Sequence, residues 1–327
     1  MQLRLRKILL SALAAASIAP SLCAAAQPGT PNYPDRPVRV IVNVSPGGGV
    51  DAVARVLSQH LHETWKQPFV VDNRVGAGGS IGVELVAKAT PDGYTLLVCS
   101  SGVVTNAAAR PGSYDPVQDL TAITSLTAAP YLLLTSSSLQ VSTVKDLIAL
   151  AKAKPGSVSF GSSGTGGILH LSAELLVALS GTRMLHVPFK GVAPAYPAVA
   201  SGDVHWILGY PTSALPLVKA GRLKAIAVTS TTRSRLLPEL PTVHESGVPG
   251  YEVIAWFGLF GPARMPANIV ARLNAEAKSA MHSPEVVRRT NLQGAEIVSN
   301  TPQAFAAEVK AEFTKWRNLV KQSGLKF

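Results

Sequence analysis

The sequence is short of the residues on which several functional classes depend. It has two cysteines in 327 residues, which is too few for a cysteine-ligated metal centre. No stretch reaches the roughly 18 uninterrupted apolar residues that a membrane span needs. Charged residues make up 15% of the chain, and the Lys and Arg residues are scattered, which is a poor fit to nucleic-acid binding. The sequence also lacks a P-loop.

The first residues are typical of an export signal. A basic start (Arg4, Arg6 and Lys7) precedes a short apolar stretch, and an A-x-A cleavage site ends at Ala26. The apolar stretch is too short to stay in a membrane as a permanent helix. We therefore predict a signal peptide at residues 1–26, cleavage near its last residue, and a periplasmic location for the mature protein.

Removal of the signal changes the chemistry of the chain. Leu22 stands where lipid attachment to Cys23 requires a small residue, so we expect no lipid anchor. The mature chain keeps 301 of the 327 residues, and its net charge falls from +11 to +8 because three basic residues leave. A mild basic excess suits an anionic ligand. Cys99 then remains without a disulfide partner, and we expect it to be a small buried apolar side chain.

Strand and helix patterns alternate along most of the mature chain. We expect strands at residues 38–44, 69–71, 94–99, 131–135, 158–160, 184–187, 205–208 and 223–228, and an apolar run at 253–260. We expect helices that begin near residues 51 and 80, helices at 144–154 and 267–282, one that ends at 179, and one at 302–322. We expect N-caps at Asp51, Ser80, Thr143 and Thr301, with Asp146 completing a capping box at the third. This β-α-β order predicts parallel sheets with right-handed crossovers.

Two such units predict an α/β protein of two lobes that face each other. We expect domain 1 to consist of residues 34–130 and 252–327, and domain 2 to consist of residues 131–251. Each lobe would be a mostly parallel sheet flanked by helices, with the ligand in the cleft between the lobes.

Three loops at the predicted carboxyl ends of strands are candidates for anion binding. The first glycine loop is Ser-Pro-Gly-Gly-Gly at residues 45–49, the second glycine loop spans residues 161–167, and Ser-Ser-Gly occupies residues 100–102. Glycines let a ligand approach the backbone, and the first turn of a helix presents unpaired N–H groups with partial positive charge. A tight turn that binds nothing would use the same glycines, so the motif alone leaves both interpretations open.

A dinucleotide site is the alternative interpretation of the first glycine loop. Gly47, Gly49 and Ala52 fit the pattern G-x-G-x-x-A, and Asp72 ends the next strand about 20 residues later, where a ribose-binding acid would stand. This pattern predicts a Rossmann-like, dinucleotide-dependent oxidoreductase. Pro46, the second glycine loop, and export to a compartment poor in soluble nicotinamide cofactors all argue against it.

Histidine and serine residues indicate no catalytic or metal site. His60 and His62 lie two positions apart on a predicted helix, so they do not share a face. Ser162 and Ser163 have no evident His and Asp partners in the sequence. His170 follows the second glycine loop directly, where it would either donate to a ligand or brace the loop.

Many segments of the chain resemble one family in register. They read YPDRPV, SPGGGVD, DNRVGAGGSIG, PDGYTLL, FGSSGTGGILH, HVPFKGVAPAYPAVASGDV, LKAIAVTS, LPTVHESGVPGYE and AWFGLFGPARMP. Over essentially the whole mature chain, the sequence resembles the Bug (TctC-like) extracytoplasmic solute receptors of tripartite tricarboxylate transporters. The resemblance implies a two-lobed periplasmic binding protein fold of class II type, whose chain crosses between the lobes twice, and an organic acid as the ligand.

The resemblance also implies which residues form the site. Main-chain groups and ordered water would hold one ligand carboxylate at Ser45, Gly47, Gly48 and Gly49 of the first lobe, and Ser100 and Ser101 would line the same side. Ser163, Gly164, Thr165 and Gly166 would present the helix N-terminus of the second lobe. His170 is a further candidate because of its position after the second glycine loop. Two segments depart from the family pattern. Many relatives have an aspartate near the end of the strand at 205–208, where this chain has Gly209, and the segment after Ser101 also differs.

We therefore predict an exported binding protein without catalytic activity, cofactor or metal. Its two α/β lobes would close around a small organic carboxylate or acidic amino acid, for uptake or for sensing. Membrane subunits of a transporter would be its protein partners, and we expect a monomer that binds no nucleic acid. The loops predict an anionic group and leave the rest of the ligand open.

Overall fold

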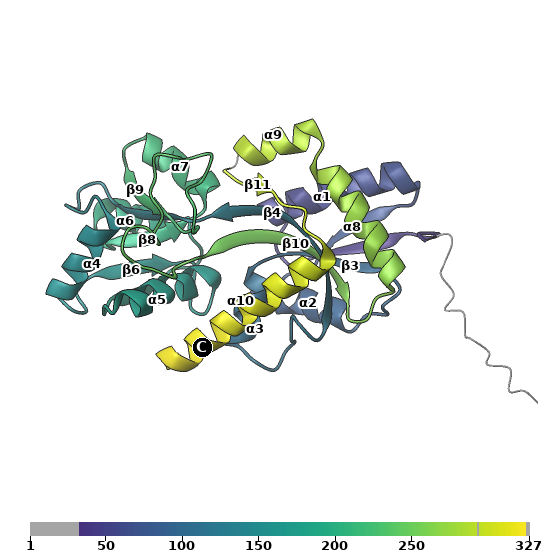
Figure 1. Cartoon of the computed structure of the whole chain (residues 1–327), viewed down its shortest axis with the longest axis horizontal. Coiled ribbons are helices and arrows are strands. Elements are labelled where there is room, and N and C mark those ends of the chain that lie inside the picture. The colour runs from purple at the N-terminus through teal and green to yellow at the C-terminus, as the bar shows by residue number, and fades with distance from the viewer. Residues whose placement is uncertain (1–32, 293, 325–327) are drawn as a thin grey trace, which may run out of the picture. The chain divides into compact units, whose positions relative to one another are not determined.

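The computed structural model describes residues 33–292 and 294–324. The predicted signal peptide and Cys23 lie outside the described residues. Helices flank two mixed β-sheets (Figure 1). In the part of the chain that the structure describes, no helix is both long enough and apolar enough to cross a membrane.

The strands divide between a six-stranded first sheet and a five-stranded second sheet. The first sheet contains β1 (Val38–Val42), β2 (Phe69–Asn73), β3 (Thr95–Ser100), β4 (Leu120–Pro130), β10 (Ile254–Pro262) and β11 (Glu296–Ile297). The second sheet contains β5 (Leu132–Ser136), β6 (Ser159–Ser162), β7 (Leu185–Pro188), β8 (Trp206–Gly209) and β9 (Leu223–Val228). The central strands are apolar on both faces because helices cover both sides of each sheet.

The helices follow the strands in chain order. They are α1 (Gly49–Trp65), α2 (Ser80–Ala87), α3 (Gly102–Ala109), α4 (Val144–Ala153), α5 (Ile168–Ser180), α6 (Ala195–Ser201), α7 (Pro211–Lys219), α8 (Ala267–Met281), α9 (Pro284–Leu292) and α10 (Pro302–Ser323), with a short 3-10 turn at Ala77–Gly79. The long helix α10 contacts both α3 and α5, so it packs against helices that belong to different sheets (Figure 1).

The two sheets share one strand order. The first reads β11-β4-β10-β3-β1-β2 and the second β7-β6-β8-β5-β9. In each, three parallel strands are followed by one antiparallel strand, β10 or β5, and then by β4 or β9. The first sheet has β11 as an additional edge strand beside β4. β1–β3 and β6–β8 pair in parallel, as predicted, and the remaining pairs between these strands are antiparallel. No helix separates β4 from β5 or β9 from β10, so the rule for helical crossovers does not govern these strands.

The chain passes between the sheets at two places. β4 ends at Pro130 in the first sheet and β5 begins at Leu132 in the second, while β9 and β10 mark the return. One apolar cluster includes Trp256 in the first sheet and Trp206 in the second, and both are almost fully buried. The division into domains at residues 130/131 and 251/252 stays a prediction, because the contacts between residues do not separate the two sheets into different compact units.

Two of the four predicted N-caps are correct. Thr143 and Asp146 form the expected capping box at α4, and the Thr301 hydroxyl accepts from Ala304 N–H at the start of α10. Asp51 and Ser80 are not caps. Gly48 caps α1 and Gly79 caps α2, because backbone turns at glycine start these helices one to three residues earlier than a side-chain cap would. Cys99 is fully buried, as predicted.

Candidate functional site

A cavity of about 700 Å³ is lined by residues of both sheets. From the first sheet come residues 44–50, the end of β3 at Ser100, and parts of β4 and β10. Val192 and the start of α7, which lie in segments that connect strands of the second sheet, also line the cavity. Ser45, Gly47, Gly48, Gly49 and Ser100 are the predicted site residues that line this cavity.

The first glycine loop presents backbone donors to the cavity. The apolar run of β1 ends at Val42, and Gly47 then adopts a φ of +86°, a left-handed conformation that favours glycine. Gly48 is extended, with a φ of −82°, and α1 begins at the next residue. Within the described chain, the N–H groups of Gly48, Gly49 and Val50 make no hydrogen bond. Three adjacent unpaired donors at the positive end of a helix of 17 residues favour an anion.

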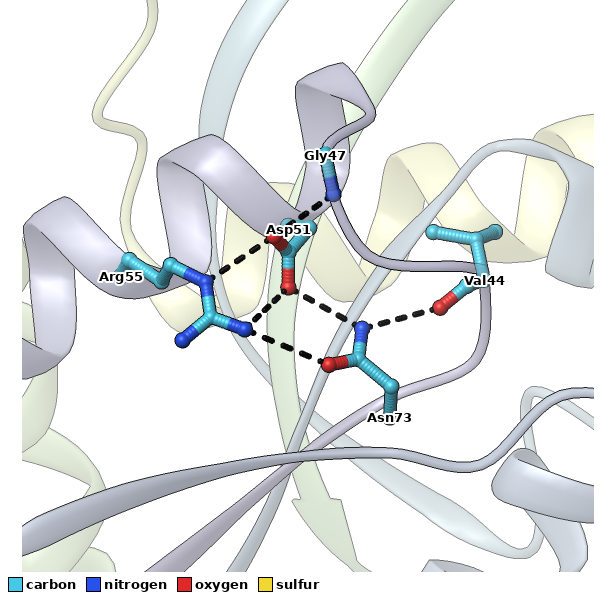
Figure 2. A network of polar contacts seen from close by, with 5 residues as sticks. All are labelled: Val44, Gly47, Asp51, Arg55 and Asn73. Carbon is cyan, nitrogen blue, oxygen red and sulfur yellow. Dashed lines mark hydrogen bonds and ion pairs between the residues drawn. The ribbon is translucent and has the colours of Figure 1, made fainter.

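Asp51 holds this loop in place from its position in the first turn of α1 (Figure 2). Its Oδ2 accepts the Gly47 N–H at 3.0 Å, and both carboxylate oxygens pair with the Arg55 guanidinium at 3.0 and 3.1 Å. Asn73, at the end of β2, donates to Asp51 Oδ1 and to the Val44 carbonyl, both at 3.0 Å. The network thus ties the loop to its own helix and to the neighbouring strand.

The Asp51 network has two consequences for an anionic ligand. The Gly47 N–H already donates within the chain, so the unpaired donors of this loop begin at Gly48. Hydrogen bonding to Arg55, assisted by Gly47 and Asn73, lowers the pKa of Asp51 to about 2 against the opposing effect of its burial. Asp51 therefore stays ionised, and Arg55 balances the charge that would otherwise repel a carboxylate.

The strands next to the two crossings between the sheets, β4 and β10, form a further wall of the cavity. Thr127 on β4 and Phe257 on β10 line it, and a Cβ added at Gly49 would lie 3.2 Å from the Phe257 ring. The aromatic ring thus packs directly over the glycine loop. Ser100 reaches the cavity from the end of β3, whereas Ser101 is buried and its N–H donates to the Trp256 carbonyl at 2.9 Å. Ser101 supports the wall without lining it.

The second sheet contributes the residues that follow β8. Tyr210, Pro211, Thr212 and Ser213 line the cavity at the start of α7. The sequence-based site did not include them. A signal was present, because Pro211 comes two residues after the end of β8 and proline is favoured at the first position of a helix.

The second glycine loop does not line this cavity. The Thr165 carbonyl accepts from Arg110 Nη2 at 3.4 Å, which places the loop beside the end of α3. The Gly164 N–H donates to Ser162 Oγ at 3.2 Å, and the Gly166 N–H donates to His170 Nδ1 at 3.0 Å. Binding of the ligand by Ser163, Gly164, Thr165 and Gly166 stays a prediction.

His170 braces the second glycine loop from beneath. Its ring is buried and stacks on His186, with ring centroids 3.7 Å apart, and its Nε2 lies 3.5 Å from Glu174 Oε1. His186 Nε2 lies 2.6 Å from Ser162 Oγ. Burial, followed by the nearby His170, lowers the pKa of His186 to about 4. At neutral pH, His186 is therefore uncharged.

The residues of the alternative dinucleotide site have other partners. The Asp72 carboxylate accepts from Arg39 Nε at 2.7 Å and pairs with Arg74 Nε at 3.0 Å, and these contacts lower its pKa. An acid held in this way is not open to a ribose. His60 Nε2 lies 3.6 Å from Glu276 Oε2, while His62 Nδ1 lies 3.0 Å from the Gln67 carbonyl, so the two histidines face different partners.

Comparison with known proteins finds one family across most of the chain. The profile described as "TctC: Tripartite tricarboxylate transporter family receptor" matches residues 53–325. Protein BugT of Bordetella pertussis is 34% identical over 297 residues, which cover 90% of this chain and 91% of that protein.

Two solved structures show the same fold. "R. palustris Rpa4515 with adipate" is 35% identical with a TM-score of 0.76, covering 90% of this chain and 99% of that chain. "MatC (Rpa3494) from Rhodopseudomonas palustris with bound malate" is 32% identical with a TM-score of 0.74, covering 88% of this chain and 100% of that chain. The predicted two-lobed binding-protein fold is confirmed by these matches.

Proposed function

Because the chain belongs to the TctC (Bug) family of tripartite tricarboxylate transporter receptors, we propose that it captures a small organic carboxylate in the periplasm. The observation that carries the proposal is the row of unpaired N–H groups at Gly48, Gly49 and Val50, which open on a cavity lined by both sheets. The family is one of solute receptors, in agreement with the prediction that the chain is not an enzyme.

In this proposal, the carboxylate lies at the start of α1 and the rest of the ligand extends toward α7. Closure of the two lobes would bring the residues around Tyr210 onto the ligand. The bound acid would then be passed to transporter subunits in the membrane or would act as a signal. Relatives whose structures contain adipate and malate support an acid as the ligand.

Periplasmic capture requires export, so cleavage of the predicted signal after Ala26 is part of the proposal. Mass spectrometry of the exported protein measures it directly. A mature chain that starts at Gln27 is expected. A lipidated Cys23 or a retained Met1 would contradict this expectation.

A thermal-shift screen of organic acids tests the binding function. Saturation at about a hundred times the dissociation constant stabilises a protein by about 2.7 kcal/mol, which is easily seen as a rise in melting temperature. Malate, adipate, hexanoate and benzoate would be compared with NAD and NADP. Stabilisation by a nucleotide and by no acid would support the oxidoreductase instead.

Gly48→Val localises the site. The extended conformation of Gly48 suits a β-branched residue, and the nearest atom to an added Cβ is Ser45 O at 3.8 Å, so the variant is expected to fold. Its side chain would stand among the three donors and remove the acid-induced shift.

Gly167→Val is the matched control. Gly167 caps α5 with a φ of −76°, close to that of Gly48, and it does not line the cavity. This variant is expected to keep the shift. If both variants lose it, the second glycine loop also binds the acid, and if both keep it, the first loop is only a turn.

A further inference from the structure

The walls of the cavity differ sharply from the loop that would hold a carboxylate. None of the lining side chains is charged, and the polar ones are hydroxyls of Ser, Thr and Tyr. Away from the first glycine loop, the walls consist mainly of alanines on β4 and β10 together with Val192, Pro211 and the Phe257 ring. A charged group placed among them would lose water without gaining a charged partner.

The start of α7 is a poor second anion site. Pro211, its first residue, has no N–H group. The N–H groups of Ser213 and Ala214 already donate to the Tyr210 carbonyl, at 3.2 and 3.0 Å. Thr212 alone among these first residues keeps an unpaired N–H, whereas α1 offers three in a row.

The hydroxyl of Ser213 is also engaged. It lies 2.8 Å from the Tyr196 hydroxyl and 3.2 Å from the Tyr210 carbonyl that it donates to. Tyr196 fills the space beside Gly209, where an added Cβ would lie 2.6 Å from its hydroxyl and 2.8 Å from Leu134. The end of β8 therefore has no room for an acidic side chain that could accept a ligand ammonium group.

From this asymmetry, and on the basis of the proposed function, we infer that the cavity selects monocarboxylates whose remaining part is apolar. One carboxylate binds the donors of α1, and an alkyl or aromatic tail packs against Phe257, Val192 and Pro211. A second carboxylate or an ammonium group finds no charged partner on the opposite wall. This preference would separate the chain from the relatives whose structures hold adipate and malate.

Hexanoate and adipate are a matched pair of ligands, because they have the same number of carbons and differ by one terminal carboxylate. Dissociation constants from isothermal titration calorimetry at neutral pH are expected to be about tenfold or more lower for hexanoate or benzoate than for adipate, malate and glutamate. Equal or tighter binding of a dicarboxylate or of glutamate overturns the inference and leaves the proposed function intact. If no acid binds, both fail.

A charge added to the opposite wall provides a second, independent test. Thr212→Lys places an ammonium group on the exposed start of α7 and is expected to strengthen adipate binding more than hexanoate binding, by about tenfold. Gln322→Lys adds the same charge on α10, away from the cavity, and is expected to change neither. An unchanged ratio of the two constants in Thr212→Lys would mean that the second end of the ligand does not reach this wall, which overturns the inference.

Discussion

Protonation of Glu312 on α10 changes the stability of the folded chain by an amount that can be measured. Its Oε2 accepts a hydrogen bond from Trp256 Nε1 at 3.0 Å, and Trp256 precedes the cavity residue Phe257 on β10. Burial raises the pKa of Glu312 from 4.5 to about 7, although Lys315 acts in the opposite direction. The folded chain therefore holds a proton on Glu312 at pH values at which the unfolded chain has lost it.

The expected effect follows from the difference between these pKa values. One pKa unit corresponds to about 1.4 kcal/mol, so the raised value is worth about 3 kcal/mol of folding free energy. This contribution is fully present below pH 4.5 and is lost as the pH rises through about 7. Glu312→Gln keeps the size of the side chain and an acceptor for Trp256 but cannot ionise. Its stability relative to the natural chain should therefore rise by about 3 kcal/mol between about pH 4 and about pH 8.

Urea unfolding at several pH values measures this difference, with the free energy of unfolding extrapolated to zero denaturant. Only the difference between the two proteins is interpreted, since His186 titrates in the same range with the opposite sign. Glu239→Gln, at an exposed position, serves as the control and should show no such trend. A difference that stays constant with pH would refute the reasoning.

Two further predictions concern the braces under the glycine loops. His186 has a pKa of about 4 instead of 6.5, so the natural chain should lose stability relative to His186→Phe as the pH falls from 6.5 to about 4. Because the ring is only half buried, a loss of about 1 kcal/mol is expected. A free energy of unfolding in urea that changes equally with pH in both proteins would contradict this prediction. Asp51→Asn should lower the free energy of unfolding by about 2 kcal/mol at neutral pH, because the pKa of about 2 reflects pairing with Arg55. The difference in stability between the two proteins should disappear as the pH falls from 3.8 through 2. Equal stability at pH 7 in the same unfolding assay would show that the network contributes nothing.

Local pattern was sufficient for the strands and helices that alternate. β1, β3 and β9 consist mostly of buried apolar residues, and such segments are visible in the sequence. β4 was missed because its residues, mostly Thr, Ser, Ala and Leu, show no regular alternation, and pairing with β10 decides its conformation. α7 was missed because it contains Pro216 inside the helix, which sequence rules treat as a break.

The candidate site was harder to predict because it depends on strand order. In the second sheet, β8 lies next to β5, whose start adjoins the crossing from β4, while β6 lies one strand further out. The loop after β8 therefore lines the cavity beside β4 and β10, and the second glycine loop, which follows β6, does not. Nothing in the local sequence states which strands are neighbours. In the sequence, the second glycine loop was the stronger signal for a binding site. In the structure, Tyr210 and Pro211 line the cavity instead.

The two glycine loops nevertheless share one local design. Gly47 and Gly166 have φ values of +86° and +81°, each is followed by an extended glycine that caps a helix, and the third helical residue, Asp51 or His170, accepts the N–H of the first glycine. Each of these two side chains also has a partner four residues later: Asp51 pairs with Arg55, and His170 lies next to Glu174. The same backbone turn is held by a carboxylate in the first loop and by an imidazole in the second. The spacing of the glycines therefore predicts the turn, whichever side chain holds it. The role of the turn then depends on whether the unpaired donors at the start of the helix line a cavity, as they do in the first loop.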